Sequence, residues 1–328
     1  MFKKLTALAL SALALLALLS GCSPSPTVLS VGDRKVDAAE YAFYLYYNRT
    51  NTDEASGTVL YTEADTAAAR EAALEQIVTT EVVRLKCQEL GLELSEAQKT
   101  TLQRNKDRLV ESLGGTAAYL EYLKQTNLTD RGYDKFQANA YYYDILYTCM
   151  TQENQAQFTD EKLRQYFAGH YATAKYIYLS LLDADGQPLD QDLRDIQTQL
   201  AESLVTQAQA EGADFDALMA QYSEDPFMTA TGIPISQQEA ASTESLSTLF
   251  DLAEGEVSGL LTCSDGYYIL KRCPIPAGYY DENQSDIYQA ALDQQFAEML
   301  DGWKLEYTVT LQPLVEEITL NNLRDYIK

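Results

Sequence analysis

The sequence predicts an α+β fold in which a mainly helical domain, made from both ends of the chain, is interrupted by a smaller α/β module with a small antiparallel sheet and surrounding helices. Three observations lead to this prediction. Helix-type patterns fill residues 37–151 and return at 282–303. Strand patterns and turn signals gather between 174 and 272, around one long helix. Val28–Val31 and Tyr307–Leu311 are strand-like segments that we expect to pair, so the first domain should be discontinuous.

The first residues look like a targeting signal rather than part of the fold. Two lysines precede an apolar run from Leu5 to Leu19, which is short for a membrane-spanning helix but typical of a secretory signal. The run ends at Leu19-Ser20-Gly21-Cys22, which resembles a bacterial lipoprotein signal with cleavage before Cys22. We therefore predict a signal peptide at 1–21 and a tether at 22–27, lipidated at Cys22. A plain secretion signal or an uncleaved anchor is the alternative.

The composition excludes two classes of partner. The 328 residues include 24 Lys+Arg and 49 Asp+Glu, which gives a formal net charge of −25. Nucleic-acid binding needs cationic side chains that displace counterions from phosphates, so we expect no nucleic-acid partner. A basic face for docking on anionic lipid is excluded for the same reason, which leaves the lipid anchor as the only contact with the membrane. His170 is the single histidine, and we expect no metal site and no cofactor.

Residues 28–170 form the predicted helical domain. It opens with two short strands around the turn Gly32-Asp33, within residues 28–36. Ser95 and Thr159 precede acidic or amide residues and therefore predict helix N-caps. The expected helices cover residues 37–50, 63–92, 95–107, 109–113, 115–125 and 129–151.

Residues 171–276 form the predicted module, and residues 277–328 return to the first domain. The module is expected to start with a strand at Ala174–Leu182 and to continue, after a turn, with a long helix at Asp190–Glu211. A short helix, a loop rich in Thr, Ser, Pro and Gly, and a second short helix near 243–251 follow. The closing hairpin consists of Val257–Cys263 and Tyr267–Arg272, joined by Ser264-Asp265-Gly266. The tail is expected to contain a helix at 282–303, a strand at Glu306–Leu311 and a terminal helix.

The cysteines that follow Cys22 have no close-spaced framework of disulfides and no zinc-site spacing. Cys263 and Cys273 are expected on the two arms of one hairpin but out of register, which disfavours a bond between them. We expect buried free thiols at Cys87, Cys149, Cys263 and Cys273.

The module resembles the parvulin-type peptidyl-prolyl isomerases. Gly212-Ala213-Asp214-Phe215, the short helix after it and Ser223-Glu224-Asp225 resemble the helix and loop of that family. Gly255-Glu256-Val257-Ser258 and Gly266-Tyr267-Tyr268-Ile269-Leu270-Lys271 resemble its closing hairpin, and Ala174–Leu179 lies where the family has its first strand. The order of signal, helices, module and returning tail is similar to that of the PrsA/SurA foldases.

The resemblance implies which residues form the site. The family has two buried histidines beside a Cys or Asp, above an apolar floor of Met and Phe. Here Tyr176 and Tyr268 occupy the histidine positions and Asp225 matches the acidic one, so these are the candidate catalytic residues. The Met and Phe positions fall on Ala241 and Ser245 instead. The candidate substrate-binding residues are Leu246, Phe250 and Met228.

The resemblance implies an extracytoplasmic, membrane-anchored foldase or chaperone that binds unfolded or partly folded secreted polypeptides, with isomerase activity weak or lost. Isomerisation of an X-Pro bond crosses a barrier of roughly 18–20 kcal/mol. A phenol with a pKa of about 10 does not reproduce the tautomers of imidazole at neutral pH. The alternatives are an active isomerase with a Tyr-substituted site and an envelope lipoprotein with one dedicated partner. A homodimer is compatible with all three.

Tyrosine is abundant, with 24 Tyr against 9 Phe and 1 Trp. Two clusters stand out on predicted helices: Tyr41, Phe43, Tyr44, Tyr46 and Tyr47 in the first, and Tyr141, Tyr142, Tyr143 and Tyr147 in the second. The default interpretation is a half-buried seam between helices, with hydroxyls that reach water. The functional interpretation is a cradle for unfolded clients, because amphipathic rings provide contact area at a low cost in entropy.

Overall fold

The computed structural model describes residues 25–50, 60–154 and 158–326. The chain forms two compact units, one made of residues 1–153 and 294–328 and the other of residues 154–293. The first unit thus contains both ends of the described part of the chain, which confirms the predicted α+β fold with a discontinuous helical domain. The domain limits after residues 170 and 276 stay predictions. Cys22 lies outside the described residues.

A three-stranded antiparallel sheet joins the two ends of the chain within the first unit. Its strands are β1 (Thr27–Val31), β2 (Arg34–Asp37) and β7 (Val309–Leu311), in the order β2-β1-β7. β1 and β2 are connected by the predicted turn, where Gly32 has a φ of +58°. On the other side of β1, Leu29 is paired with Leu311. The predicted pairing of the two terminal segments is therefore confirmed.

Helices make up the rest of the first unit. They are α2 (Ala38–Tyr47), α3 (Glu63–Glu89), α4 (Glu96–Ser112), α5 (Thr116–Gln125), α6 (Asp130–Asn154), the second part of α12 (Gln284–Glu306), and the short α13 (Leu314–Glu317) and η5 (Leu323–Tyr326). Ser95 caps α4 as predicted, because its side chain accepts the N–H of Gln98.

Two predictions for these helices are wrong. A single helix, α4, replaces the two expected at 95–107 and 109–113, because no Gly or Pro separates those segments and the first break is at Gly114, with a φ of +95°. The expected terminal helix is divided into the two short pieces α13 and η5.

The core of the first unit lies between the N-terminal elements and the returning tail. Leu29, Tyr41 and Ile77 are buried in the same cluster as Val315 and Ile318. The Tyr41 hydroxyl also donates to the backbone carbonyl of Val315 at 3.3 Å. The tail therefore completes the core as well as the sheet.

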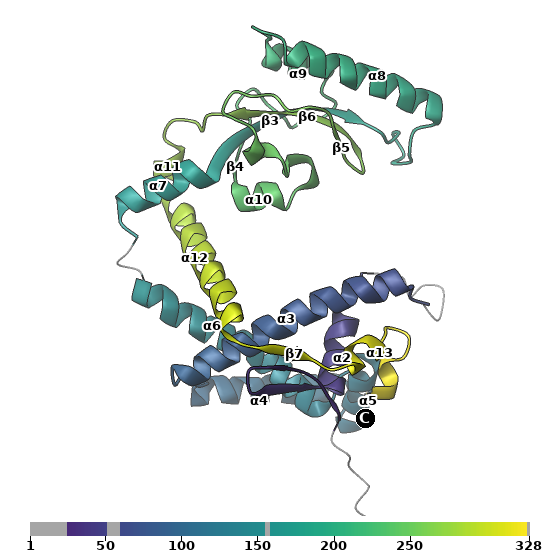
Figure 1. The fold of residues 1–328 in the computed structure, drawn as a ribbon, viewed down its shortest axis with the longest axis vertical. Helices are drawn as coiled ribbons and strands as arrows, with labels where there is room; N and C mark the ends of the chain where they lie inside the picture. Colours follow the sequence, from purple (N-terminus) through teal and green to yellow (C-terminus); the bar gives the residue numbers. More distant parts are fainter. Residues whose placement is uncertain (1–24, 51–59, 155–157, 327–328) are drawn as a thin grey trace, which may run out of the picture. The chain divides into compact units, whose positions relative to one another are not determined.

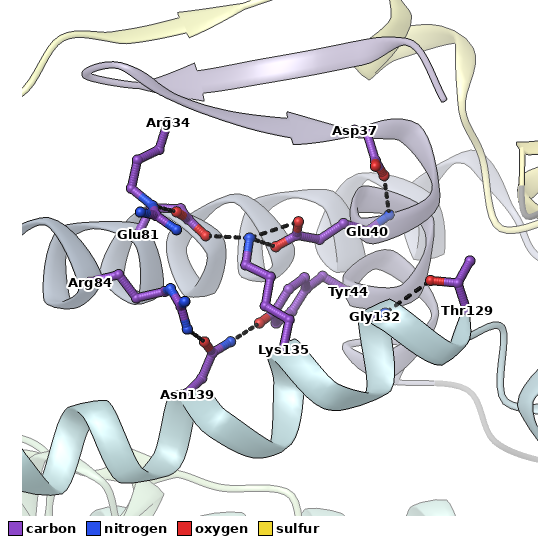
Figure 2. A network of polar contacts seen from close by, with 10 residues as sticks. All are labelled: Arg34, Asp37, Glu40, Tyr44, Glu81, Arg84, Thr129, Gly132, Lys135 and Asn139. Atoms are coloured by element: carbon purple, nitrogen blue, oxygen red, sulfur yellow. Dashed lines mark hydrogen bonds and ion pairs between the residues drawn. The ribbon is translucent and has the colours of Figure 1, made fainter. Parts of the chain in front are cut away.

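A buried polar network connects four elements of this unit (Figure 2). Glu81 of α3, whose side chain is 1% exposed, forms ion pairs with Arg34 of β2 and, at 2.7 Å, with Lys135 of α6. Lys135 also donates to both carboxylate oxygens of Glu40 of α2, at 2.6 and 2.8 Å. Two carboxylates thus balance two cations, which is what buried ionised groups require.

The second unit is built on a four-stranded antiparallel sheet, in the order β4-β3-β6-β5. Its elements are α7 (Asp160–His170), β3 (Tyr171–Ser180), α8 (Gln191–Ala208), α9 (Phe215–Tyr222), β4 (Ile233–Ser236), α10 (Gln237–Ala241), η3 (Glu244–Leu246), η4 (Leu249–Asp251), β5 (Leu261–Thr262), β6 (Gly266–Cys273), α11 (Tyr279–Glu282) and the first part of α12. In Figure 1, α8 and α9 cover one face of the sheet, where Ile177 and Ile269 are buried. The other face is covered by α10, η3 and η4, over Ala174 and Leu270.

The loop predicted before the second short helix contains two elements, β4 and α10. β4 pairs with residues 171–174, so β3 begins at Tyr171 rather than at Ala174. Pro234 is tolerated because β4 is an edge strand, where a missing N–H leaves no ladder partner unpaired. The second short helix, expected near 243–251, consists of the 3₁₀ turns η3 and η4.

The first arm of the predicted hairpin is shorter than expected. Val257–Cys263 was predicted as a strand, but only β5 is regular, with an isolated bridge between Val257 and Lys271. The Ser258 hydroxyl accepts the N–H of Leu270 at 2.8 Å and thus takes the place of a backbone partner. A side chain that bonds to the backbone in this way interrupts the ladder.

The cysteines at positions 87, 149, 263 and 273 are free thiols. Burial, which was predicted for all four, is found for Cys87 and Cys263, whereas Cys149 and Cys273 are half-buried. Burial raises the pKa of the Cys87 thiol to about 11, so this thiol stays protonated at neutral pH.

Candidate functional site

Tyr176 and Tyr268, at the two predicted histidine positions, lie on the central strands of the second sheet. Tyr268 of β6 is paired with Tyr178 of β3. Because side chains two residues apart in a strand share a face, the three tyrosines lie on the same face of the sheet. The rings of Tyr176 and Tyr268 meet edge to face with centroids 5.4 Å apart, and those of Tyr178 and Tyr268 are 4.8 Å apart.

Asp225 is positioned by the segment that follows α9. The N–H of Glu224 donates to the carbonyl of Tyr178 at 2.8 Å, and the N–H of Tyr178 donates to the Ser223 hydroxyl at 3.1 Å. The Glu224 carboxylate accepts the N–H of Ser180 at 2.7 Å. These bonds hold residues 223–224 against β3, so the next residue, Asp225, comes within reach of Tyr176.

Tyr176 and Asp225 form a hydrogen-bonded pair. The Tyr176 hydroxyl donates to Asp225 Oδ2 at 2.5 Å, and Asp225 Oδ1 accepts the N–H of Phe227 at 2.8 Å. Burial raises the pKa of Tyr176, and the bond to the carboxylate raises it further, because a phenolate beside Asp225 would place two negative charges together. At neutral pH the phenol is therefore a proton donor that is already engaged.

Tyr268 has a different acidic partner. Its hydroxyl donates to Asp265 Oδ2 at 2.9 Å, and burial together with this carboxylate raises its pKa. The Tyr178 hydroxyl donates to the backbone carbonyl of Asp265 at 3.2 Å. Neither Tyr178 nor Asp265 was predicted from the sequence as a site residue. The two-residue spacing from Tyr176 signals Tyr178, whereas Asp265 was interpreted only as a turn residue.

The structure thus pairs two of the three candidate catalytic residues, Tyr176 and Asp225, with each other, and pairs the third, Tyr268, with Asp265. The pairs touch through ring contacts and share no hydrogen bond. Stabilisation of a twisted amide requires polar groups aimed at the substrate rather than at each other. This arrangement offers engaged donors and no imidazole that could exchange a proton at neutral pH.

The candidate substrate-binding residues are not brought together as an exposed floor. Leu246 is 5% exposed and packs in the core on the face of the sheet that α10 covers. Met228 packs in the core on the opposite face, which α8 and α9 cover. Phe250 is half-buried, with the Arg272 guanidinium 5.0 Å from its ring centroid. The exposed apolar side chain next to Asp225 is Phe227, which is 87% exposed and was not predicted from the sequence as a site residue.

A glycine allows the close approach of the tyrosine-bearing strands. A Cβ added to Gly266 would lie 2.5 Å from the carbonyl oxygen of Leu179 and nearer still to the Tyr178 ring. Gly266→Ala should therefore destabilise the second unit by about 1–3 kcal/mol through overpacking. Gly259→Ala is the matched control, because its Cβ would meet no atom within 4 Å. Urea midpoints read from tyrosine absorbance measure both variants, and an unchanged midpoint for Gly266→Ala would contradict the prediction.

The first unit contains a second candidate site, a cavity of about 410 Å³. It lies among α2, α3 and α6, and its walls alternate aromatic or aliphatic side chains with amides and hydroxyls. The lining residues are Tyr44, Gln76, Thr79, Thr80, Val83, Phe136, Gln137, Asn139, Ala140, Tyr143 and Asp144. Its volume is within the range of about 300–1,000 Å³ that is typical of ligand sites.

The wall of this cavity is held by hydrogen bonds (Figure 2). Asn139 accepts from Arg84 at 3.1 Å and donates to the Tyr44 hydroxyl at 3.2 Å. Burial raises the pKa of Tyr44 to about 12, so its hydroxyl keeps its proton. Gln76, which also lines the cavity, accepts a hydrogen bond from Asn48 at 2.8 Å. Because Lys135 faces Glu40 and Glu81, its charge is turned away from the cavity.

The two tyrosine clusters contain both buried and exposed rings. Tyr41 and Tyr44 are buried in the core, as a helix seam requires. Tyr47 is 54% exposed and Tyr143, which lines the cavity, is 41% exposed. Tyr47 and Tyr143 are thus the cluster rings that are exposed enough for the predicted cradle, which stays a prediction.

Comparison with known proteins identifies two domains. Residues 2–115 match the SurA-like N-terminal domain, and residues 162–272 match the PPIC-type PPIase domain. No curated protein matches the chain.

Among solved structures, the chain is similar to the foldase protein PrsA from Streptococcus pneumoniae, with 20% identity, coverage of 76% of this chain and 90% of that chain, and a TM-score of 0.30. The peptidylprolyl isomerase PrsA from Bacillus anthracis gives 18% identity, 71% and 95% coverage and a TM-score of 0.32. A structure from the work on the SurA-like chaperones PEB4 and Cj1289 of Campylobacter jejuni gives 13% identity, 88% and 100% coverage and a TM-score of 0.32.

Proposed function

Because the chain combines a SurA-like N-terminal domain with a PPIC-type domain, it has the architecture of the PrsA/SurA-like parvulin foldases, and we propose that it acts mainly as a chaperone. In this proposal the cavity of the first unit binds unfolded or partly folded secreted polypeptides. The parvulin module assists as a scaffold, with isomerase activity that is weak or lost.

One observation supports the proposal that the isomerase activity is weak or lost. Each candidate catalytic hydroxyl is committed to its own carboxylate, Tyr176 to Asp225 and Tyr268 to Asp265, in positions where the family has histidines. To act on a prolyl amide, either hydroxyl must first break a charge-assisted hydrogen bond, which is among the stronger hydrogen bonds in proteins. Asp225 accepts hydrogen bonds on both of its oxygens, which limits it as a base as well.

The proposed location is outside the cytoplasm, on a lipid anchor at Cys22. The proposal depends on the Leu19-Ser20-Gly21-Cys22 sequence after a basic and apolar start. Within the described residues, no helix combines the length and apolar character that crossing a bilayer requires. Metabolic labelling with a fatty acid tests the anchor, and loss of label in Cys22→Ala is the expected result.

The isomerase assay separates this proposal from an active enzyme. In a protease-coupled cis–trans assay on proline peptides, we expect the wild type to leave the rate at its uncatalysed value and Asp225→Ala to change nothing. Both proteins should suppress aggregation of an unfolded client equally, because Asp225 lies in the module. Robust turnover that disappears in Asp225→Ala would instead establish an isomerase with a Tyr-substituted site.

The chaperone site is tested by filling the cavity. Ala140 is exposed and lines the cavity, so Ala140→Trp should occupy it without disturbing the core and should reduce aggregation suppression. Ala97→Trp, on the exposed surface of α4, is the matched control. Equal suppression by both variants would contradict a role for the cavity. Co-purification of one protein rather than many clients would favour a lipoprotein with a dedicated partner.

A further inference from the structure

The charge of the cavity is carried by a single side chain. Among the described residues that line it, Asp144 is the one charged group, and it is exposed. The cations nearest to this wall are engaged elsewhere: Lys135 pairs with Glu40 and Glu81, and Arg84 donates to Asn139 and lies over the Tyr142 ring at 4.5 Å. Within the described residues, no cation forms an ion pair with Asp144.

The rest of the lining is suited to a bound peptide, because it can contact both an apolar side chain and the main chain beside it. Val83, Phe136 and Tyr143 provide apolar and aromatic surface. Gln137 also lines the cavity, and its amide forms no hydrogen bond within the described part of the chain. A primary amide offers a donor and an acceptor together, which matches the C=O and N–H of an extended peptide.

We propose that the cavity selects segments of unfolded polypeptide in which a large apolar residue is flanked by Lys or Arg. The apolar side chain enters between α3 and α6, the main chain contacts Gln137, and the basic side chain pairs with Asp144. This inference depends on the proposed chaperone function. A solvent-exposed ion pair of this kind is worth up to about fivefold in affinity.

The net charge of −25 alone attracts basic peptides at low salt, so the test must separate this general attraction from a local contact. Three labelled peptides share one central Phe in a Gln- and Ser-rich sequence, and its two neighbours are Lys, Gln or Glu. Dissociation constants are measured by fluorescence anisotropy with the wild type, Asp144→Asn and Asp144→Lys. Glu111→Lys, at an exposed position of α4 outside the cavity, is the control with the same change in net charge.

The wild type should bind in the order Lys, Gln, Glu, and the differences should shrink as salt rises. Asp144→Lys should reverse the order, whereas Glu111→Lys should preserve it. Because Asp144 is exposed, its variants should fold, and far-UV circular dichroism checks this. The same order of affinities in Asp144→Lys and Glu111→Lys would overturn the selection while leaving the chaperone function intact. Absence of binding by any peptide, with aggregation suppression unaffected by Ala140→Trp, would overturn both.

Discussion

Replacement of Glu81 by glutamine is expected to lower the free energy of unfolding by about 3–5 kcal/mol, the usual cost of removing one partner from a buried ion pair. The Glu81 side chain is 1% exposed, and it faces both Arg34 and Lys135. Glutamine keeps the size of the side chain but leaves two cations with the single carboxylate of Glu40. Urea unfolding of the full chain, followed by a signal that reports on the first unit, measures the decrease in the free energy of unfolding.

The matched control is on the same helix. Glu75 also forms an ion pair, with Lys304 at 2.5 Å, but its side chain is 66% exposed. Solvent screens such pairs, so Glu75→Gln should cost only about 0–1 kcal/mol. Equal losses for Glu75→Gln and Glu81→Gln would show that burial does not govern the network and would contradict the prediction.

The pH dependence gives an independent check. Burial alone would raise the pKa of Glu81, but Lys135 and Arg34 outweigh it and hold the pKa below its ordinary value. Its contribution is therefore complete above that value and is lost as pH falls through the lowered pKa. The difference in stability between the wild type and Glu81→Gln should shrink over this acidic range.

Glu40 should behave in the opposite way. Burial raises its pKa despite Lys135, so the ionised form carries a penalty that is relieved as pH falls through the raised pKa. The stability of the wild type relative to Glu40→Gln should consequently increase on acidification. Parallel curves for the two variants would contradict this assignment of opposite pKa shifts.

Local signals account for most of the fold that the sequence predicts correctly. The cap at Ser95, the Gly32-Asp33 turn and the strand patterns at both ends act over a few residues, so they are visible without a structure. β4 was missed because it has four residues, including a proline, and exists only through its pairing with β3. The prediction split α4 into two helices because α4 has no buried residues, so no hydrophobic stripe in the sequence indicates that the helix is continuous.

The candidate sites show the same limit. The contact of Tyr176 with Asp225 follows from the family resemblance, but the choice of partner for Tyr268 depends on how the hairpin turn folds Asp265 back toward it. In the sequence, only the tyrosine clusters indicated a binding surface in the region of the cavity. Its walls come from helices far apart in sequence, and which of Tyr44 and Tyr143 is buried depends on packing rather than on periodicity.

Removal of residues 307–328 is expected to unfold the first unit. These residues supply β7 and four buried side chains of the main core, Val315, Ile318, Leu320 and Leu323. Each buried aliphatic side chain contributes about 1.5–3 kcal/mol, so the four together contribute about 6–12 kcal/mol. A typical domain has a total stability of only about 5–15 kcal/mol. Loss of β7 also leaves β1 as an exposed edge strand, which favours aggregation.

The second unit provides the internal reference for this experiment. It has its own cores on both faces of its sheet, made of residues that the truncation leaves in place. The amide resonances of β3 and β6 should therefore persist while those of α2 and α3 collapse. Removal of residues 324–328 alone is the matched control, because Arg324 and Asp325 are exposed and Tyr326 is only half-buried. If the chain without residues 307–328 kept the resonances of α2 and its wild-type urea midpoint, the tail would be an accessory to the helical domain rather than part of its core.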